Sequence, residues 1–320
     1  MTVLILADEL DIAADHMVRV LRDRGVGVCR IDTAWFPSQL GLRAELRGGR
    51  WVGELRTPRR VLDLEAVRAV WYRSPAAFRF PAELSPTERR HAYTEAKLGL
   101  GGVLVSLPVR WVNHPHRLAD AVYKPAQLVT AARCGLAVPP TLVTNEPDAV
   151  RSFAGQAPDG VVTKMFGAAT VGEEGRRKVA FTRVVTPDEL ADLRGVEVTA
   201  HQFQHWIDKA YDARVIAVGE RLFGFAIHAG TAEARVDFRN DYQALRYEVL
   251  EPPAEVATGI RRYLNAFGLL YGALDFVVTA DGRWIFLECN PGGQYGWLEA
   301  QTGVPITTAL ADLLAEGHTA

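Results

Sequence analysis

The sequence predicts an α/β protein of two or three domains, and three observations lead to this fold class. The chain has 320 residues, whereas single hydrophobic cores stop growing near roughly 250 to 300 residues. Its composition, 48% hydrophobic and 23% charged, is typical of a folded globular protein. The chain also opens with an apolar strand, an amphipathic helix and a second strand, an order that favours a parallel sheet. We therefore expect a substrate cleft between domains.

The charge balance and the apolar segments exclude several function classes. Lysine and arginine number 36 against 38 acids, a net charge of -2, which argues against a nucleic-acid binder driven by bulk charge. No apolar run reaches the roughly 18 residues of a membrane span, and residues 1–11 lack the basic start of a secretory signal. The three cysteines, Cys29, Cys134 and Cys289, are widely spaced, which favours a reducing cytoplasm.

The amino-terminal third is predicted from local patterns. Residues 2–7 form an apolar strand, and a helix over 12–24 ends before Gly25. The next predicted elements are a strand over 25–32, a hairpin of 42–47 and 51–56, a short helix and strand over 62–73, and a helix over 85–104. Ser85 and Glu88 form a capping box at the start of that last helix, and Pro86 is its first residue.

The pattern changes near residue 115, where Asn113 and Pro115 predict a loop. The predicted elements beyond it are a helix over 126–134, a strand after Pro140, two strands around a Gly-rich loop in 161–185, a short helix from 186, a long helix over 254–267 and a helix after Pro305. The predicted domains are 1–115, 116–198 and 199–320.

The strongest chemical signal is a predicted hairpin near the carboxyl end. Residues 271–278 and 283–293 are two apolar strands joined by a turn at Asp281 and Gly282. Asp275 lies in the first strand, while Glu288 and Asn290 lie on one face of the second. Buried carboxylates must be paired or hold a cation, and two acids with an amide suit Mg²⁺. The alternative is that both acids pair with arginines. Cys289 should point to the opposite face, into the core.

Two lysines and a glycine-rich loop form a second signal. Lys124 and Lys164 lie on different predicted elements, and the loop from Gly167 to Gly175 follows the second lysine directly. Glycines permit a backbone to close over phosphates. The alternatives are solvated lysines and an ordinary hairpin tip. The chain lacks a GxxxxGK[ST] phosphate-binding loop.

A third cluster precedes a predicted hairpin that turns at Gly219 and Glu220. It holds Gln202, Gln204, Asp208, Asp212 and Arg214. Arg214 lies in a Val- and Ile-rich strand and is a candidate fork for anionic oxygens, although an arginine at a strand edge is usually a surface residue. Three nearby histidines are not interpreted as catalytic. His114 should cap a helix or pack, and His201 with His205 lacks a third ligand for zinc.

In this order the motifs resemble the ATP-grasp superfamily, over about two thirds of the chain. The resemblance implies an ATP-grasp fold behind an amino-terminal pre-ATP-grasp α/β domain, with ATP and Mg²⁺ as cofactors. It implies phosphate binding by Lys124 and Lys164 under the loop 167–175. Residues 202–207 would be the adenine-side hinge, with Gln202, Gln204, Asp208 and Asp212 as the cofactor-binding set. Arg214 would stabilise the anion, and the metal ligands would be Asp275, Glu288 and Asn290.

A narrower resemblance, carried by residues 69–81, 111–128 and 228–242, is to the ATP-grasp peptide maturases that make graspetides, especially the actinobacterial branch. These ligases join Glu or Asp side chains of a ribosomal precursor peptide to Ser or Thr hydroxyls or Lys amines. VDFR at 236–239 has Phe where better-known members have Trp, but it keeps Asp237, a candidate base or orienting group, and Arg239. The resemblance implies a precursor with a leader and an acidic core, and a homodimer.

Several basic residues are candidate contacts for an acidic precursor, namely Arg73, Arg79, Arg176, Arg177, Lys178, Arg183, Arg235 and Arg239. A solvated basic face is the alternative for the run at 176–178. Two other functions stay open from the sequence. One is a ligase that adds free amino acids to a protein tail or a small acid, and the other is a non-catalytic ATP-binding interaction module.

Overall fold

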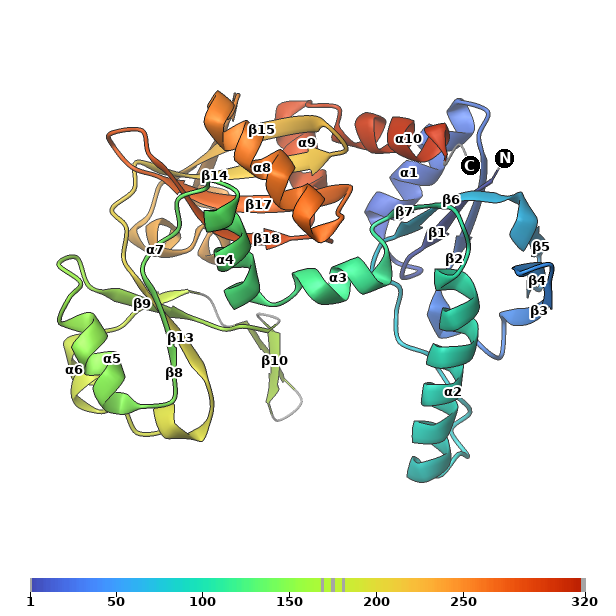
Figure 1. Cartoon of the computed structure of the whole chain (residues 1–320), viewed down its shortest axis with the longest axis horizontal. Coiled ribbons are helices and arrows are strands. Elements are labelled where there is room, and N and C mark those ends of the chain that lie inside the picture. The colour runs from blue at the N-terminus through green and yellow to red at the C-terminus, as the bar shows by residue number, and fades with distance from the viewer. Residues whose placement is uncertain (1, 168–169, 174–175, 180–181, 318–320) are drawn as a thin grey trace.

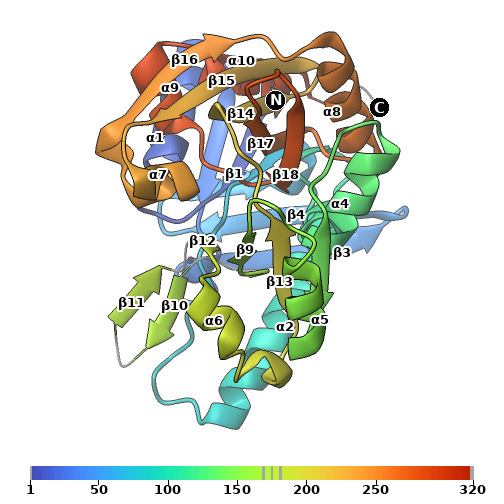
Figure 2. The same cartoon turned by 90° about the vertical axis from the view of Figure 1, so that its left-hand side faces the viewer.

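The computed structural model describes residues 2–167, 170–173, 176–179 and 182–317. Its elements form three groups (Figure 1): the amino-terminal sheets on the right, a small sheet at the lower left, and the carboxyl-terminal sheet with its helices at the upper left. Figure 2 shows the small sheet below the carboxyl-terminal sheet. This arrangement is the α/β architecture that the sequence predicts.

A four-stranded parallel sheet forms the centre of the amino-terminal part. Its strand order is β2-β1-β6-β7, with β1 (Thr2–Leu6), β2 (Gly27–Ile31), β6 (Val67–Tyr72) and β7 (Arg110–Val112). Helix α1 (Ile12–Asp23) packs on the face of Val3 and Ile5, and α2 (Pro86–Val105) on the face of Leu4 and Leu6. Strand β1 is apolar from Val3 to Leu6, because both of its faces are buried there.

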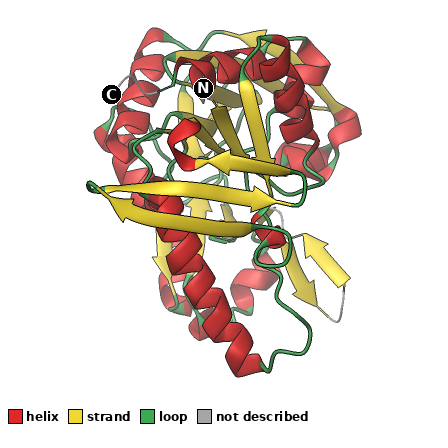
Figure 3. Cartoon of the chain, turned by 90° about the vertical axis from the view of Figure 1, so that its right-hand side faces the viewer, coloured by secondary structure: helices red, strands yellow, loops and turns green. Residues whose placement is uncertain are grey.

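A small antiparallel sheet lies beside it (Figure 3), in the order β3-β4-β5. Strands β3 (Gly41–Arg47) and β4 (Arg50–Thr57) confirm the predicted hairpin, and both turn glycines, Gly48 and Gly49, have positive φ. The third strand, β5 (Arg60–Asp63), was not predicted. Short 3₁₀ helices cover Thr33–Trp35 and Leu64–Ala66. Helix α2 projects away from the sheets (Figures 1 and 3), and its capping box is confirmed.

The segment after β7 corrects one prediction. Pro115 begins helix α3 (Pro115–Ala121) rather than a loop, because proline fits the first helical position and the His114 ring accepts from the His116 N–H. His114 is thus a cap, as predicted. Helix α4 (Lys124–Arg133) begins two residues before the predicted start at 126, so Lys124 lies in its first turn.

The small sheet at the lower left is antiparallel in the order β12-β9-β13-β8. Its strands are β8 (Thr141–Thr144), β9 (Val161–Lys164), β12 (Arg183–Val184) and β13 (His201–His205). Beside it lie α5 (Pro147–Ala154), α6 (Pro187–Ala191) and a 3₁₀ turn, Val196–Val198. The hairpin of β10 (Thr170–Glu173) and β11 (Arg176–Val179) contains most of the predicted phosphate-covering loop, whose residues 168–169 and 174–175 lie outside the described ones.

A five-stranded antiparallel sheet dominates the carboxyl-terminal part, in the order β16-β15-β14-β17-β18. Its strands are β14 (Tyr211–Val218), β15 (Arg221–Ala229), β16 (Leu245–Leu250), β17 (Tyr271–Val278) and β18 (Trp284–Asn290). The helices are α7 (Ala232–Val236), α8 (Ala254–Phe267), α9 (Gly296–Thr302) and α10 (Ile306–Glu316), with 3₁₀ turns at Phe238–Asn240 and Tyr242–Ala244. Helix α8 occupies the predicted range.

Two cores cover the faces of this sheet. On one face α8 packs with Leu128 and Ala131 of α4, and on the other α10 packs with Met17 and Leu21 of α1. The carboxyl-terminal helix therefore joins the amino-terminal part of the molecule (Figure 1). Among the described residues, none of the helices has the length and apolarity to cross a membrane.

Candidate active site

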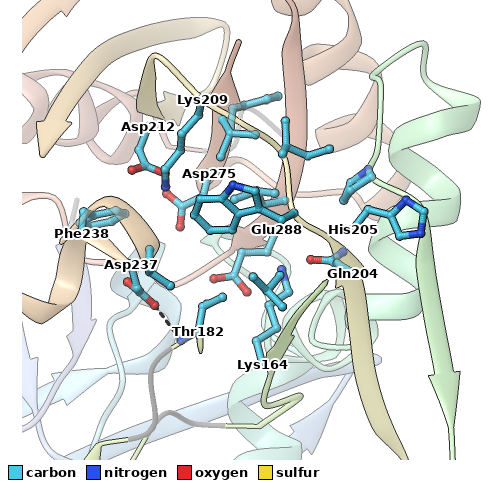
Figure 4. A pocket seen from close by; sticks show the side chains of 18 of the residues that line it. Lys164, Thr182, Gln204, His205, Lys209, Asp212, Asp237, Phe238, Asp275 and Glu288 are labelled. Atoms are coloured by element: carbon cyan, nitrogen blue, oxygen red, sulfur yellow. Dashed lines mark hydrogen bonds and ion pairs between the residues drawn. The ribbon is translucent and has the colours of Figure 1, made fainter. Parts of the chain in front are cut away.

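Strand register brings the predicted residues together. Lys164 on β9 lies opposite Gln202 on β13. Arg214 on β14 lies opposite Asp275 on β17, which lies opposite Glu288 on β18. Because directly paired residues point to the same face of a sheet, the last three side chains form a row across three strands. Figure 4 shows Asp275, Glu288 and Lys164 pointing into one cavity.

That cavity lies between the small sheet and the carboxyl-terminal sheet. One part is apolar and is lined by Val162, Trp206, Ile207 and Leu287. The other part is charged, and through Lys164, Arg239 and Glu288 it adjoins a second cavity that Lys124 and Asn290 line. The cleft is therefore amphipathic along its length.

Arg214 and Asp275 form a buried two-point ion pair. Arg214 Nε and Nη2 donate to the two Asp275 oxygens at 2.7 and 2.8 Å, and Arg214 is only 8% exposed. The guanidinium also lies over the rings of Phe238 and Trp297, at 5.4 and 5.7 Å. A planar guanidinium suits both contacts. Arg214 is thus a buried site residue and not the surface residue that strand-edge arginines usually are.

Glu288 is surrounded by cations. Lys124 Nζ lies 2.8 Å from one carboxylate oxygen, and Arg239 Nη1 lies 3.6 Å from the other. Although burial favours the neutral acid, Lys164 and Lys124 hold the pKa of Glu288 well below its usual range. Burial lowers the pKa of Lys164 to about 8 despite the opposing charge of Glu288. The single negative charge of Glu288 neutralises only part of the positive charge of these three cations. The remaining positive charge suits a polyanionic ligand.

Asp237 and Arg239 form a second two-point pair. Arg239 Nε and Nη2 each lie 2.8 Å from an Asp237 oxygen, and the Thr182 N–H also donates to that carboxylate at 3.0 Å (Figure 4). Burial opposes ionisation, but these hydrogen bonds lower the pKa of Asp237. Asp237 is therefore a weak base.

Lys209 was missed by the sequence analysis. It is buried, its Nζ lies 2.7 Å from Asp212 Oδ1, and it sits over the Trp206 ring at 5.8 Å. Burial raises the pKa of Asp212 to about 6, against the opposing pull of Lys209. The other oxygen, Asp212 Oδ2, has no hydrogen-bond partner among the described residues. The spacing of a lysine three residues before an acid was the signal for this pair, but such spacing is common on surfaces.

Three predicted cofactor residues have different surroundings. Gln204 is buried at the cavity and donates to Thr141 Oγ1 at 2.9 Å. Gln202 is buried beside Lys164, and neither of its amide atoms finds a partner within the described part of the chain. Asp208 is exposed, pairs with Arg235 at 2.8 Å and does not line the cavity. The predicted cluster of residues 202–214 therefore separates into buried residues near the cavity and one surface acid, Asp208.

The structure divides the predicted precursor contacts into buried and exposed residues. Arg73 is buried and bonded to the chain, so it is not a surface for a peptide, whereas Arg79 is exposed. Arg183 and Arg235 are exposed but already paired with Glu189 and Asp208. The side chains of the run at 176–178 lie outside the described residues.

The proposed metal ligands supply two carboxylates and an amide. Asp275 and Glu288 are direct neighbours across β17 and β18, and Asn290 lies two residues beyond Glu288 on the same face. Cys289, between the last two, is buried in the core as predicted. Both carboxylates are paired with basic side chains, Asp275 with Arg214 and Glu288 with Lys124. The alternative that the acids pair with arginines therefore holds for Asp275. A hard oxygen-donor set of this kind also fits Mg²⁺, and the metal site stays a prediction.

Two antiparallel sheets that enclose an amphipathic cleft, with lysines from both sides and acids on a terminal hairpin, define the ATP-grasp class of ligases. Residues 2–119 match the family described as the MvdD pre-ATP grasp domain. The macrocyclase MdnC of Microcystis aeruginosa MRC, solved bound with precursor peptide MdnA, is 31% identical, covers 99% of this chain and 100% of its own, and superimposes with a TM-score of 0.87.

Two further structures are similar over nearly the whole chain. A Chryseobacterium gregarium RiPP-associated ATP-grasp ligase, in complex with ADP and a leader and core peptide, is 28% identical over 98% of this chain and 96% of its own, with a TM-score of 0.90. The macrocyclase MdnB of Microcystis aeruginosa MRC is 29% identical over 99% of both chains, with a TM-score of 0.82. No curated protein sequence matches the chain. The chain belongs to the family of ATP-grasp ligases of ribosomal peptides, the graspetide synthetases.

Proposed function

We propose that this protein is an ATP-dependent ligase that crosslinks a ribosomal precursor peptide, joining Glu or Asp side chains to Ser or Thr hydroxyls or Lys amines. The observation that carries the proposal is one cluster in which four cations surround two acids at the charged part of the cleft. The cations are Lys124, Lys164, Arg214 and Arg239, and the acids are Asp275 and Glu288. The identity with MdnC over the full chain supports a peptide as the substrate.

The apolar part of the cleft suits the adenine of ATP, with Trp206, Ile207 and Leu287 as its walls. Asp212 Oδ2, which has no partner in the described part of the chain, is a matched acceptor for a ribose hydroxyl, because an unpartnered buried carboxylate gains from any donor it meets. Lys124 and Lys164 would then hold the phosphate oxygens. Gln202, whose buried amide has no partner among the residues that the structure describes, lies beside Lys164 and would assist the two lysines.

Asp275, Glu288 and Asn290 would hold Mg²⁺. When bound, the metal supplies charge neutralisation for the phosphates. With nucleotide present, Lys124 can transfer from Glu288 to a phosphate oxygen, which would leave that carboxylate available. Arg214 would similarly exchange one of its two hydrogen bonds with Asp275 for a hydrogen bond to the substrate oxygen.

The site would perform the reaction in two steps. A precursor carboxylate oxygen attacks the γ-phosphorus of ATP, which forms an acyl phosphate and releases ADP. A hydroxyl or amine of the same peptide then attacks the acyl carbon, loses its proton and displaces phosphate. Arg214 would stabilise the oxyanion that forms in this second step.

We assign Asp237 an orienting role rather than that of a general base. A general base works best with a pKa near the working pH, whereas hydrogen bonds from Arg239 and the Thr182 N–H hold this carboxylate in its ionised form. Asp237 would instead fix Arg239 toward the carboxylate or phosphate. We further propose a cytoplasmic location, which the three free cysteines support.

The test is a reaction with ATP, Mg²⁺ and a short acidic peptide drawn from the reading frames that flank the gene, followed by mass spectrometry. Crosslinking removes one water for each ring and releases one ADP. An increase in peptide mass in the presence of free amino acids would instead indicate a ligase that adds amino acids. Nucleotide binding without any ADP release would favour a non-catalytic module.

A further inference from the structure

The loop that follows the proposed metal ligands is held by an ordered set of side chains. The carbonyls of Pro291, Gly292 and Gly293 accept one hydrogen bond each. The donors are Asn113 Nδ2 at 2.8 Å, Arg73 Nη1 at 3.1 Å and the Tyr271 hydroxyl at 2.7 Å, in that order. Three successive carbonyls are thus fixed by three different elements.

The same loop orients the side chain of Asn290. The Gly292 N–H donates to Asn290 Oδ1 at 3.2 Å, and the Gly293 N–H donates to the Asn290 carbonyl at 3.1 Å. The packing is also tight, because a Cβ at Gly293 would lie 2.6 Å from the Ala273 Cβ. Gly292 therefore connects the Arg73 guanidinium on one side with the Asn290 amide on the other.

Arg73 comes from the amino-terminal part of the chain, directly after β6. It is 4% exposed, its guanidinium lies over the Trp71 ring at 5.7 Å, and its Nε lies 3.4 Å from Asp11 Oδ2 at the start of α1. Its second terminal nitrogen donates to the Gln294 side chain. Burial of a rotamer-rich cation is costly, so this residue has a specific structural use.

Asn113, directly after β7, complements Arg73. It is 2% exposed and uses its whole amide. Its oxygen accepts from the Leu270 and Tyr271 N–H groups at 2.8 and 3.1 Å, and its nitrogen donates to the Tyr271 and Pro291 carbonyls at 2.8 Å each. It therefore joins the start of β17, which carries Asp275, to the loop after β18.

We propose that Arg73 and Asn113 are positioning residues, through which the amino-terminal domain sets the place of the Asn290 amide for Mg²⁺·nucleotide binding. The inference rests on the proposed function, because it takes Asn290 as a metal ligand. Residues that orient metal ligands typically contribute 10- to 100-fold to metal affinity or activity. The amino-terminal domain then acts on the nucleotide site without touching the nucleotide.

The test compares Arg73→Gln and Asn113→Asp with the unchanged protein in calorimetric titrations of ADP at a series of Mg²⁺ concentrations. We expect the half-saturating Mg²⁺ concentration to rise by about 10-fold or more in both variants. ADP binding at saturating Mg²⁺ should be preserved. Circular dichroism melting curves record folding separately.

Arg110→Gln is the matched control. Arg110 also lies in the amino-terminal part and donates to a carbonyl of the carboxyl-terminal part, that of Leu313, at 2.9 Å. This variant should keep the Mg²⁺ requirement of the unchanged protein. An unaltered requirement in Arg73→Gln and Asn113→Asp, with only a lower melting temperature, would overturn the inference alone. Absence of Mg²⁺-dependent ADP binding in the unchanged protein would overturn the proposed function and the inference together.

Discussion

Arg214 combines a buried structural ion pair with the anion-stabilising role that we propose for it. Its guanidinium neutralises the buried Asp275 and lies over the rings of Phe238 and Trp297. Removing one partner of a buried ion pair leaves an uncompensated charge, which commonly costs about 3 to 5 kcal/mol. An alanine at this position would therefore confuse loss of folding with loss of chemistry, and a charge-preserving change is more informative.

We expect Arg214→Lys to lower turnover by about 10² to 10³, because lysine cannot offer two parallel donors to Asp275 and a developing oxyanion. Nucleotide affinity should stay close to that of the unchanged protein. Steady-state ADP release and ADP titration calorimetry measure the two effects. Arg235→Lys, in an exposed pair with Asp208, is the control and should alter neither. Normal turnover in Arg214→Lys would contradict the role of this residue.

We expect Asp212 to give nucleotide binding a pH dependence. Burial raises its pKa to about 6, so the carboxylate takes up a proton as the pH falls through that value. If a ribose hydroxyl donates to the ionised form, ATP affinity is full above about pH 6 and falls by up to about tenfold for each unit below it.

We expect Asp212→Asn to bind ATP more weakly at pH 7 and to lack this component of the pH dependence. Titrations of ATP and of 2′- and 3′-deoxy-ATP between pH 5 and 8 measure the effect. The exposed Asp208→Asn should keep the original profile. An identical profile in the Asp212 variant would exclude this carboxylate as the titrating group.

At the scale of elements, helix α4 is fixed against strand β18 by Gln127. Its amide donates to the Ala121 and Cys289 carbonyls at 2.7 and 2.9 Å and accepts from the Cys289 N–H at 2.8 Å. Gln127 lies one turn after Lys124, and Cys289 directly follows Glu288. These three hydrogen bonds, which we call the Gln127 clamp, therefore fix the 2.8 Å contact between Lys124 and Glu288.

Gln127→Leu should destabilise the fold, because it leaves the Cys289 N–H and carbonyl buried without partners. Each unsatisfied group costs about 1 to 3 kcal/mol, so we expect a loss of about 2 to 6 kcal/mol in urea unfolding. Gln301→Leu, at an exposed position of α9, should change stability little. A stability loss no larger than that of the control would contradict this account.

At the scale of the molecule, one hydrophobic core joins the two ends of the chain. Met17 and Leu21 of α1 pack with Leu310 and Leu314 of α10, and all four side chains are fully buried. The amino-terminal domain is thus coupled to the sheet that carries the active site. The predicted segments 1–115 and 199–320 lie far apart along the chain, and this core joins them.

Leu310→Ala is expected to lower the free energy of unfolding by about 2 to 5 kcal/mol through the cavity it leaves. Because the core is shared, the melting transition should shift as a whole. Scanning calorimetry measures both the shift and its shape. The exposed Leu46→Ala (62% exposed) should have almost no effect. A separate early transition of the amino-terminal part, with the rest unchanged, would contradict the shared core.

The predictions from sequence succeeded where local chemistry decides the structure. The helix over 12–24 had an apolar periodicity and a glycine stop, the helix over 85–104 had a capping box, and the hairpin at Gly48 and Gly49 had its turn signal. The α3 helix and strands β5 and β7 were missed because they are short and depend on neighbours for stability. Pro115 fits both a loop and a first helical turn, and only packing of α3 distinguishes them.

By itself the sequence determined the α/β class, the strands that carry Lys164, Arg214, Asp275 and Glu288, and the ATP-grasp family, because periodicity and motif order are local properties of a chain. Only the tertiary structure decided which charges meet. Strand register paired Arg214 with Asp275, the Gln127 clamp brought Lys124 to Glu288, and burial made Lys209 and Arg73 internal cations. Coulomb interactions and desolvation depend on distance in space, which the order of residues along the chain does not specify.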